Sequence, residues 1–177
     1  ASSSYYLPLD RVKRALGYIQ QGKTVPRGTL QTEFEYLPYN EVRRLGLKAQ
    51  MEEKVRTRFP EETGMLVVKS LLPKGPADSK LVPGDIVIGC NGQMVPHFIA
   101  LFQILDDSVG DQIKLTISRG KKVMDVDLTV QDLHSITPDR FVEVGGGIVH
   151  ELSYQLAKSY SQPVGGVYVA TSGHMLA

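Results

Sequence analysis

The sequence has a single cysteine, no long apolar run and almost no excess of charge. Cys90 alone cannot form an internal disulfide, and a lone cysteine without other ligands is a poor indication of a metal site. No apolar stretch approaches the about 20 residues that a membrane-spanning helix needs, and residues 1–6 lack the basic and apolar regions of a signal peptide. We therefore expect no metal, no cofactor, no membrane anchor and a reducing compartment.

The balance of charge excludes partners that are bound through bulk electrostatics. Twenty Lys and Arg residues face 19 Asp and Glu residues, which leaves a net charge of +1. Nucleic acid and anionic membrane surfaces are bound by strongly basic proteins, so we expect neither as a partner. The 177 residues are 42% hydrophobic and 22% charged, which is ordinary for a globular protein with a real core.

Residues 1–22 predict a short strand and one amphipathic helix. The strand is Tyr5-Tyr6-Leu7, ended by Pro8, and Asp10 is the expected N-cap of the helix. Apolar residues recur at helical spacing, so one stripe must pack on something: Val12, Ala15, Leu16 and Ile19. The passage is too short to be a domain, and we interpret it as the last strand and closing helix of a body that lies mostly upstream.

Residues 23–63 predict an extended segment followed by helix and charged chain. The stretch from Thr29 to Phe34 favours a strand, which Pro38 should end. Asn40 is expected to cap a helix over residues 41–45 that stops at Gly46. Residues 48–62 are rich in charge and predict a solvated helix or loop.

Residues 64–95 contain two apolar strands and two glycine turns. The run from Gly64 to Val68 is typical of a strand that is buried on both faces, and residues 77–81 predict one helical turn. The second strand, residues 86–90, is followed by Asn91-Gly92. Asn and Gly tolerate the positive φ angles of a type I′ turn, so residues 94–95 should run back beside Ile88.

Residues 96–132 predict a helix and a hairpin. The helix should end near residues 108–110, and its apolar residues share one face: Phe98, Leu101, Phe102 and Leu105, with Ile104 widening the stripe. Alternating apolar residues then predict strands over 113–117 and 126–130. The whole order predicts a compact domain with a small, barrel-like antiparallel sheet and helices packed on it.

The last 45 residues repeat the beginning of this pattern. A strand at 141–144, a glycine run at 145–147, a helix over 149–160 and a strand at 166–170 follow one another, and Gly64 and Gly166 are 102 positions apart. No counterpart of Gly84-Asp85 follows, so we expect a partial repeat and a chain that is a piece of a longer protein. The predicted units are therefore 1–22, 23–132 and 133–177.

The stretch from Leu81 to Gly92 resembles the most diagnostic segment of PDZ domains. Gly84 can adopt the left-handed conformation and Asp85 can accept hydrogen bonds from nearby backbone amides, and Asn91-Gly92 completes this structural signature. The element order resembles the circularly arranged PDZ domains of HtrA serine proteases. Residues 4–12 resemble the final strand and helix of their protease domain. Among HtrA proteases, the pairing of this tail with two PDZ-like units is most similar to the fungal nuclear, pro-apoptotic branch with duplicated protease and PDZ regions.

The resemblance implies an α+β fold and a peptide-binding groove. The expected architecture is a PDZ-like, partly open antiparallel β-barrel with two or three helices, preceded by the terminal strand and helix of a trypsin-like domain and followed by a partial second PDZ-like unit. A bound peptide would join the sheet edge as an added strand, with its carboxylate at the backbone amides of the loop 29–32. The residues implied to contact peptide are Thr29, Leu30, Gln31, Thr32 and Phe34, with Ile99 and Phe102 on the neighbouring helix. Gln31 stands where the family usually has glycine, which favours an internal segment or a neighbouring domain over a terminal carboxylate.

The sequence offers no complete set of hydrolytic residues. His97, His134, His150 and His174 lie in no His-Glu-x-x-His motif, and no serine stands in a Gly-x-Ser-x-Gly elbow. Cys90 alternates with Ile86 and Ile88 and is expected to be a buried small hydrophobe. The glycines 145–147 are followed by no Lys-Ser or Lys-Thr and are not a phosphate loop. We therefore expect a chain without catalysis of its own.

Three functions remain open at this point. The first is a peptide-binding, regulatory PDZ region of an HtrA-like serine endopeptidase that acts in protein quality control and apoptosis, located in the nucleus or cytoplasm. Its partners would be peptide segments added as strands, other domains of the parent protease, and further copies in a homo-oligomer. The second is a structural spacer whose groove is occupied, and the third is the PDZ portion of a membrane or periplasmic protease, which predicts a membrane span or a Ser-Lys pair.

Overall fold

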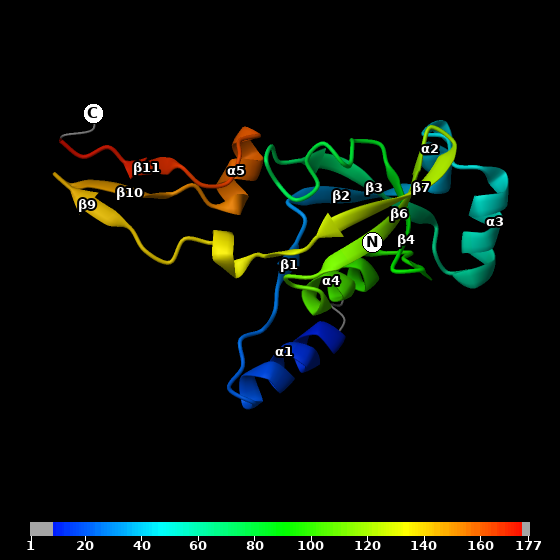
Figure 1. The fold of residues 1–177 in the computed structure, drawn as a ribbon, viewed down its shortest axis with the longest axis horizontal. Helices are drawn as coiled ribbons and strands as arrows, with labels where there is room; N and C mark the ends of the chain where they lie inside the picture. The colour runs from blue at the N-terminus through cyan, green and yellow to red at the C-terminus, as the bar shows by residue number, and fades with distance from the viewer. Residues whose placement is uncertain (1–8, 175–177) are drawn as a thin grey trace, which may run out of the picture.

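A computed structural model describes residues 9–174 of the chain (Figure 1). The strand predicted at Tyr5-Tyr6-Leu7 therefore lies outside the described residues. The first described element is helix α1 (Asp10–Gln20), which lies across helix α4 (Phe98–Asp107). Its expected core stripe is largely open to solvent, because Val12 is 59%, Leu16 50% and Ile19 62% exposed.

One antiparallel sheet of six strands forms the centre of the molecule. Its strands follow the order β2-β3-β4-β6-β7, and a short strand β5 pairs with β4. The bounds are β2 Thr32–Pro38, β3 Gly64–Leu71, β4 Ile86–Cys90, β5 Gln93–Met94, β6 Gln112–Arg119 and β7 Lys122–Thr129. A separate ribbon pairs β1 (Gly28–Thr29) with β8 (Gln131–Asp132). Strand β2 thus lies at one edge of the main sheet.

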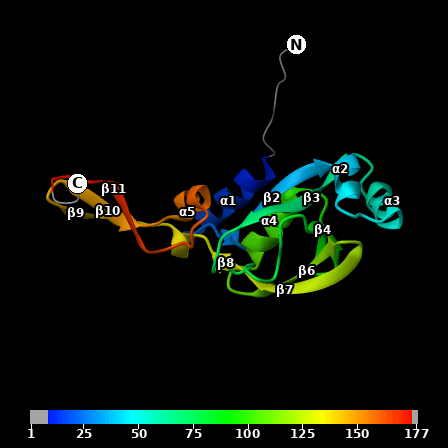
Figure 2. The ribbon, with the colours of Figure 1, turned by 90° about the horizontal axis from the view of Figure 1, so that it is seen from above.

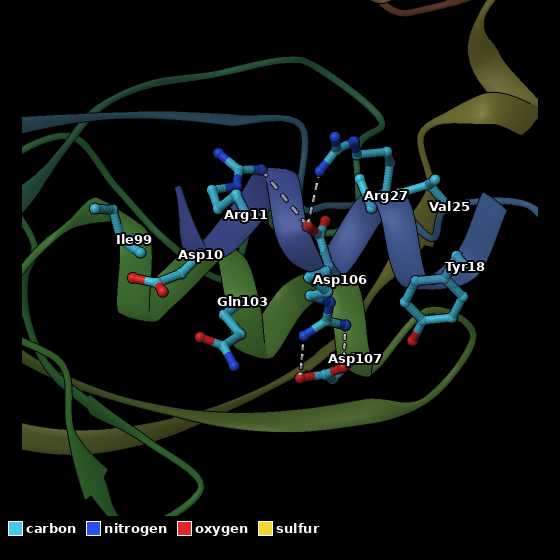
Figure 3. Close-up of a pocket in the computed structure, with 11 residues that line it drawn as sticks. Asp10, Arg11, Tyr18, Val25, Arg27, Ile99, Gln103, Asp106 and Asp107 are labelled. Carbon is cyan, nitrogen blue, oxygen red and sulfur yellow. Dashed lines mark hydrogen bonds and ion pairs between the residues drawn. The ribbon is translucent and has the colours of Figure 1, made fainter. Parts of the chain in front are cut away.

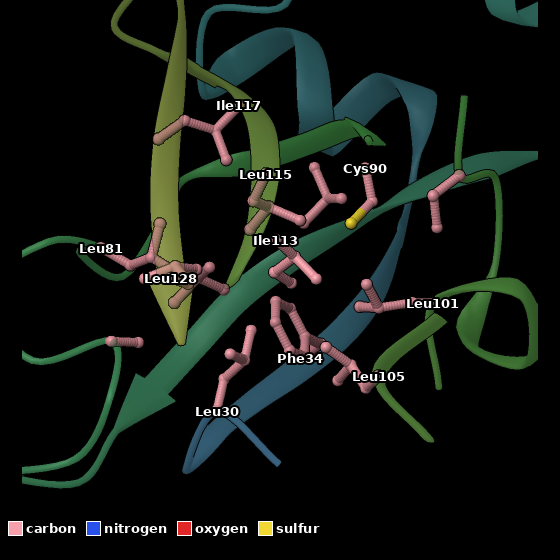
Figure 4. Close-up of a cluster of buried hydrophobic side chains, with 14 of the residues drawn as sticks. Leu30, Phe34, Leu81, Cys90, Leu101, Leu105, Ile113, Leu115, Ile117 and Leu128 are labelled. Carbon is pink, nitrogen blue, oxygen red and sulfur yellow. The ribbon is translucent and has the colours of Figure 1, made fainter. Parts of the chain in front are cut away.

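Two apolar clusters cover the two faces of strands β3 and β4. The first cluster lies between the sheet and α4, and it includes Leu66, Val68, Leu101 and Leu105 (Figure 4). The second cluster lies under α2 (Tyr39–Arg44) and α3 (Ala49–Arg58) and includes Val42, Val55, Met65 and Val67. Alternate residues of β3 point into opposite clusters, as a continuous apolar strand requires.

The turns that join these strands follow from local chemistry. Asn91 and Gly92 have φ angles of 50° and 78°, which the type I′ turn needs at both central positions. The amide of Val95 donates to the carbonyl of Ile88 over 3.2 Å, so the returning strand lies where the sequence predicts it. Helix α4 begins after His97, whose Nδ1 accepts the amide of Ala100 at 3.3 Å.

The Gly-Asp turn is fixed by an ion pair whose carboxylate is buried. Gly84 has a φ of 92°, and the fully buried Asp85 accepts the amide of Val82 at 2.9 Å. Arg119 of β6 donates to both carboxylate oxygens of Asp85, at 2.7 Å each, and to the carbonyl of Lys80 at 2.9 Å. Its hydrogen bond to Asp85 raises the pKa of Arg119. The turn before β4 is therefore tied to the neighbouring strand β6.

The C-terminal passage forms a smaller sheet at one end of the molecule (Figure 2). After the 3-10 turn η1 (His134–Ile136), this sheet has the order β11-β10-β9. Its elements are β9 Val142–Val144, β10 Gly147–Glu151, α5 Tyr154–Tyr160 and β11 Val167–Thr171. Helix α5 lies on the side that faces the main sheet (Figure 1).

Four local predictions are wrong. Asp10 is the first residue of α1 and Leu9 occupies the N-cap, without a side-chain cap. Pro38 rather than Asn40 occupies the N-cap of α2. Residues 77–81 form hydrogen-bonded turns instead of a helix. Residues 149–151 belong to β10, and the helix begins only after Ser153, whose hydroxyl accepts the amide of Leu156.

The predicted fold class is confirmed. The antiparallel sheet is partly open, and helices α2, α3 and α4 pack on the main sheet. A second, smaller set of strands with one helix follows it. The exact limits of the three predicted units, at 22/23 and 132/133, stay predictions.

Candidate peptide-binding groove

A groove of about 420 Å³ runs between the edge strand β2 and helix α4. Strand β2 pairs with β3 on one side only, so its other edge faces this groove. Backbone N–H and C=O groups on such an edge can accept an additional strand. The groove is lined by residues of β1, β2, α4 and α5, by residues of the adjoining loops and by Arg11 of α1: Arg27, Gly28, Thr29, Leu30, Thr32, Glu33, Phe34, Phe102, Leu105, Asp106, Leu133, Tyr154 and Lys158.

The loop between β1 and β2 holds a non-glycine residue in the left-handed region. Gln31 has a φ of 52°, its amide donates to Thr29 Oγ1 at 3.0 Å, and its carbonyl accepts the amide of Leu72 at 3.0 Å. Its side chain leaves the groove, because Nε2 donates to Gln131 Oε1 of β8 at 2.7 Å. Buried contacts thus hold the conformation that glycine would adopt at lower cost.

Asp106 organises the charges at the end of α4 (Figure 3). Its side chain is 7% exposed, and it accepts the amide of Gly28 at 2.9 Å and Arg27 Nη1 at 3.1 Å. Arg11 of α1 is a second cation near it, with 3.5 Å between nitrogen and oxygen. A Cβ at position 28 would overlap the carbonyl of Leu105, so glycine permits this close approach of β1 to α4.

A second cavity, of about 400 Å³, separates α1 from α4. Arg14 forms a bidentate ion pair with Asp107, whose hydrogen bond raises the pKa of Arg14. Ile99, Gln103 and Tyr18 line the same cavity (Figure 3). The guanidinium of Arg11 lies 5.8 Å from the ring centroid of Phe102, so α1 also contacts the helix that borders the groove.

Helix α5 reaches the groove from the C-terminal passage. Burial raises the pKa of Tyr154, the nearby Glu33 raises it further, and an interaction with the Thr29 hydroxyl lowers it. The pKa of Glu33 is lowered, chiefly by a hydrogen bond from Lys69, with Ser70 and Lys158 contributing in the same direction. Tyr154 and Lys158 line the groove together with residues of β1 and β2.

The structure brings most of the predicted contact residues together. Thr29, Leu30, Thr32, Phe34 and Phe102 all line the groove. Gln31 lies behind it, against Gln131, and Ile99 lines the cavity beside α1. Gly84, Asp85, Asn91 and Gly92 lie in turns at the two ends of β4, away from these lining residues.

Several lining residues were not found by sequence reasoning. Arg11, Tyr154 and Lys158 come from segments on either side of the predicted domain. Arg27 stands inside it, just before the predicted loop, and Asp106 stands on the polar border of an apolar stripe. Position in the fold, rather than any local motif, brings them to one place. Only the position of Arg27 directly before the predicted loop could have drawn attention to it.

The side chains of Cys90, His97 and His134 are buried or hydrogen-bonded to the backbone. Burial raises the pKa of Cys90 to about 11, which keeps the sulfur in its unreactive thiol form. His97 caps α4, and Nε2 of His134 lies 2.9 Å from the carbonyl of Val25. Within residues 9–174, no group of three or more His, Cys, Asp and Glu side chains could hold a metal ion. Among the helices in that range, none has both the length and the apolar character to span a bilayer.

Family comparisons agree with this architecture. Residues 37–118 match the family described as PDZ domain, and residues 135–177 match the family described as PDZ-like domain. With the edge strand, the flanking helix and the Gly-Asp turn, these matches identify two segments that are similar to PDZ domains.

The chain is, more specifically, similar to the PDZ region of HtrA-like serine proteases of the NMA111 type. It is 50% identical over 169 residues to the pro-apoptotic serine protease nma111 of Aspergillus terreus, which covers 96% of this chain and 16% of that protein. It is 46% identical over 187 residues to Protease Do-like 7 of Arabidopsis thaliana, covering 99% of this chain and 17% of that protein. The chain thus spans about a sixth of the length of these relatives.

Solved HtrA structures share the fold. The HtrA-type protease AlgW with decapeptide superimposes with a TM-score of 0.52 at 21% identity, over 71% of this chain and 35% of that one. AlgW with tripeptide gives a TM-score of 0.50 at 22% identity, over 68% and 36%. The predicted resemblance to HtrA-like proteases is therefore confirmed.

Proposed function

We propose that the chain is the peptide-binding, regulatory PDZ region of an HtrA-like serine endopeptidase and has no catalytic residues of its own. The observation that carries this proposal is the unpaired edge of β2 beside α4, with about 420 Å³ of open groove between them. Ligand sites commonly have volumes of about 300 to 1,000 Å³. The two AlgW structures are of that protease with a decapeptide and with a tripeptide, which supports the same use of this groove here.

Peptide would bind as an added strand along β2. The backbone edge supplies sequence-independent hydrogen bonds, and Phe102 and Leu105 supply an apolar wall for side chains. Gln31 keeps the left-handed loop conformation, but its amide already donates to Thr29, so a terminal carboxylate must displace that hydroxyl to use it. An internal segment has no such competitor.

The test is a titration of labelled peptides against the chain, comparing Phe102→Ala with Ile104→Ala. Both residues are half-buried on α4 and pack on the same cluster, but only Phe102 lines the groove. Loss of an aromatic contact should weaken binding by about tenfold for Phe102→Ala, with little change for Ile104→Ala. Peptides with a free and an amidated C-terminus distinguish carboxylate capture from internal binding. Absence of saturable binding to the unmodified chain would defeat the proposal.

One observation favours the rival function of a structural spacer. Helix α5 lies against the groove, so the two units could serve to pack the parent protein or set its oligomeric state. If the chain is a spacer, Phe102→Ala should change the assembly state measured by light scattering, and the unmodified chain should bind no peptide.

The properties of the whole protease follow only by similarity. We propose a parent with serine endopeptidase activity and a role in apoptosis, which the names of the relatives support. A role in quality control, homo-oligomeric assembly and a nuclear or cytoplasmic location are proposed from the resemblance to HtrA proteases. An active-site serine label on the full-length protein should react outside this chain. A label found on any serine of residues 1–177 would contradict the assignment.

A further inference from the structure

The peptide groove has a wall that comes from the second PDZ-like unit. Tyr154 and Lys158 stand four positions apart on α5, which places them on one face of the helix, and both line the groove. The hydroxyl of Ser153 caps the start of α5 by accepting the amide of Leu156. The cap fixes the end of the helix at which Tyr154 stands.

Tyr154 meets the groove at the loop between β1 and β2. Tyr154 and Thr29 both line the groove, and the hydroxyl oxygen of Thr29 accepts the amide of Gln31 at 3.0 Å. A peptide that enters the groove at this end must therefore pass beside the phenol ring. The ring offers it an apolar face and one polar tip.

Lys158 is the cation at the groove that lacks a close anionic partner. The carboxylate of Asp106 is shared by Arg27, Arg11 and the amide of Gly28. The carboxylate of Glu33 pairs with Lys69 at 3.0 Å and accepts the hydroxyl of Ser70. Among the described residues, Lys158 forms no ion pair within 4.0 Å and is exposed; its attraction to Glu33, whose pKa it helps to lower, acts without such an ion pair. Its charge is available to a ligand.

Helix α5 borders the groove without filling it. About 420 Å³ remains open while Tyr154 and Lys158 stand at its rim. This volume suits several peptide side chains. A free cation beside a groove with open backbone favours a peptide that carries negative charge.

We propose that Tyr154 and Lys158 contact the ligand bound in the groove of the first unit, and that Lys158 makes this groove prefer peptides with Asp or Glu beside α5. The two PDZ-like units would then form one composite site. The inference rests on the proposed peptide binding, and it adds the second unit as a source of specificity.

The experiment measures fluorescence anisotropy of two labelled peptides that differ only by Asp or Lys at one position. At low salt, the chain should prefer the acidic peptide by about fivefold, since an exposed charge pair contributes modestly and the lysine peptide is repelled. Lys158→Glu should reverse the preference and Lys158→Gln should abolish it. Raising the ionic strength should reduce the preference.

Lys122→Glu is the matched control. It makes the same change in net charge on β7, at the opposite edge of the main sheet from β2, and Lys122 is exposed like Lys158. The preference of this variant should equal that of the unmodified chain. Tyr154→Ala should weaken both peptides by about the same factor, because it removes contact area rather than charge.

The outcomes separate the two proposals. If Phe102→Ala weakens binding but Lys158→Glu still prefers the acidic peptide, the composite site is overturned and the proposed function stands. Tighter binding by Tyr154→Ala also overturns it, because α5 would then cover the groove rather than contact the ligand. If the unmodified chain binds neither peptide, the proposed function and the composite site fall together.

Discussion

Replacement of Arg119 by methionine should destabilise the first unit far more than its partly exposed position on β6 would indicate. Asp85 is fully buried, and Arg119 supplies both of its charged hydrogen bonds at 2.7 Å, leaving only the amide of Val82 as a further donor. The variant leaves a buried carboxylate without its counter-ion. Removal of one partner from a buried pair costs about 3 to 5 kcal/mol. The side chain of Arg119 is 36% exposed, so water can partly replace it, and we expect about 3 kcal/mol.

Urea unfolding followed by circular dichroism measures this loss. With a denaturant slope of about 2 kcal/mol per molar, 3 kcal/mol lowers the midpoint by about 1.5 M. Arg44→Met is the control, since it removes an arginine that is 76% exposed and pairs with Glu41 on the surface. Such pairs contribute about 0 to 1 kcal/mol. Equal midpoints for the two variants, or a loss below about 1 kcal/mol in Arg119→Met, would refute the reasoning.

Three further predictions concern single positions. Gly28→Ala should destabilise the chain by more than about 2 kcal/mol, because the added Cβ would overlap the carbonyl of Leu105. Gly17→Ala in α1, where nothing lies within 4 Å of the added Cβ, should be neutral or stabilising, and thermal unfolding of both variants measures the difference. Cys90 should resist a thiol reagent at pH 8 until the chain unfolds, since burial raises its pKa to about 11, and rapid reaction in the folded state would contradict the burial. The pKa of Glu52 is lowered to about 2, chiefly by the hydrogen bond from Arg43, so Glu52 contributes stability that is lost as the pH falls from about 4.5 to 2. In urea titrations, the unmodified chain should be about 2 kcal/mol more stable than Glu52→Gln at pH 7, and this difference should vanish across that pH window. A difference that does not depend on pH would exclude this origin.

Local patterns predicted the central sheet well, because its elements are specified by neighbouring residues. Asn91-Gly92 determines a turn through its own backbone preferences, and the stripe from Phe98 to Leu105 needs only helical spacing to indicate a buried face. The predicted start of the helix at residue 149 was wrong because residues 149–151 pair with β11, and Val149 pairs with β9 as well. Such pairing depends on residues that are distant in the sequence, and three residues are too few to show the periodicity of a helix or a strand.

The groove was only partly predictable for a related reason. Residues 29–34 could be assigned to it because they follow one another along the chain. Ile99 and Phe102 lie on the same helix, yet one meets α1 and the other meets the groove, and spacing cannot tell which neighbour a helix face will find. Arg11 and Lys158 are 147 positions apart in the sequence and meet only through the tertiary fold.

The ribbon of β1 and β8 has a mechanical consequence. It joins the segment that enters the main sheet to the segment that leaves it, with Gly28 opposite Asp132 and the amide of Leu133 donating to the carbonyl of Arg27 at 2.8 Å. A pulling force applied through the segment before β1 or the segment after β8 therefore acts on this two-stranded ribbon before it acts on the main sheet. Thr29 is one of the four residues of the ribbon and also lines the groove, so tension between the flanking parts of a longer protein would first strain this part of the groove.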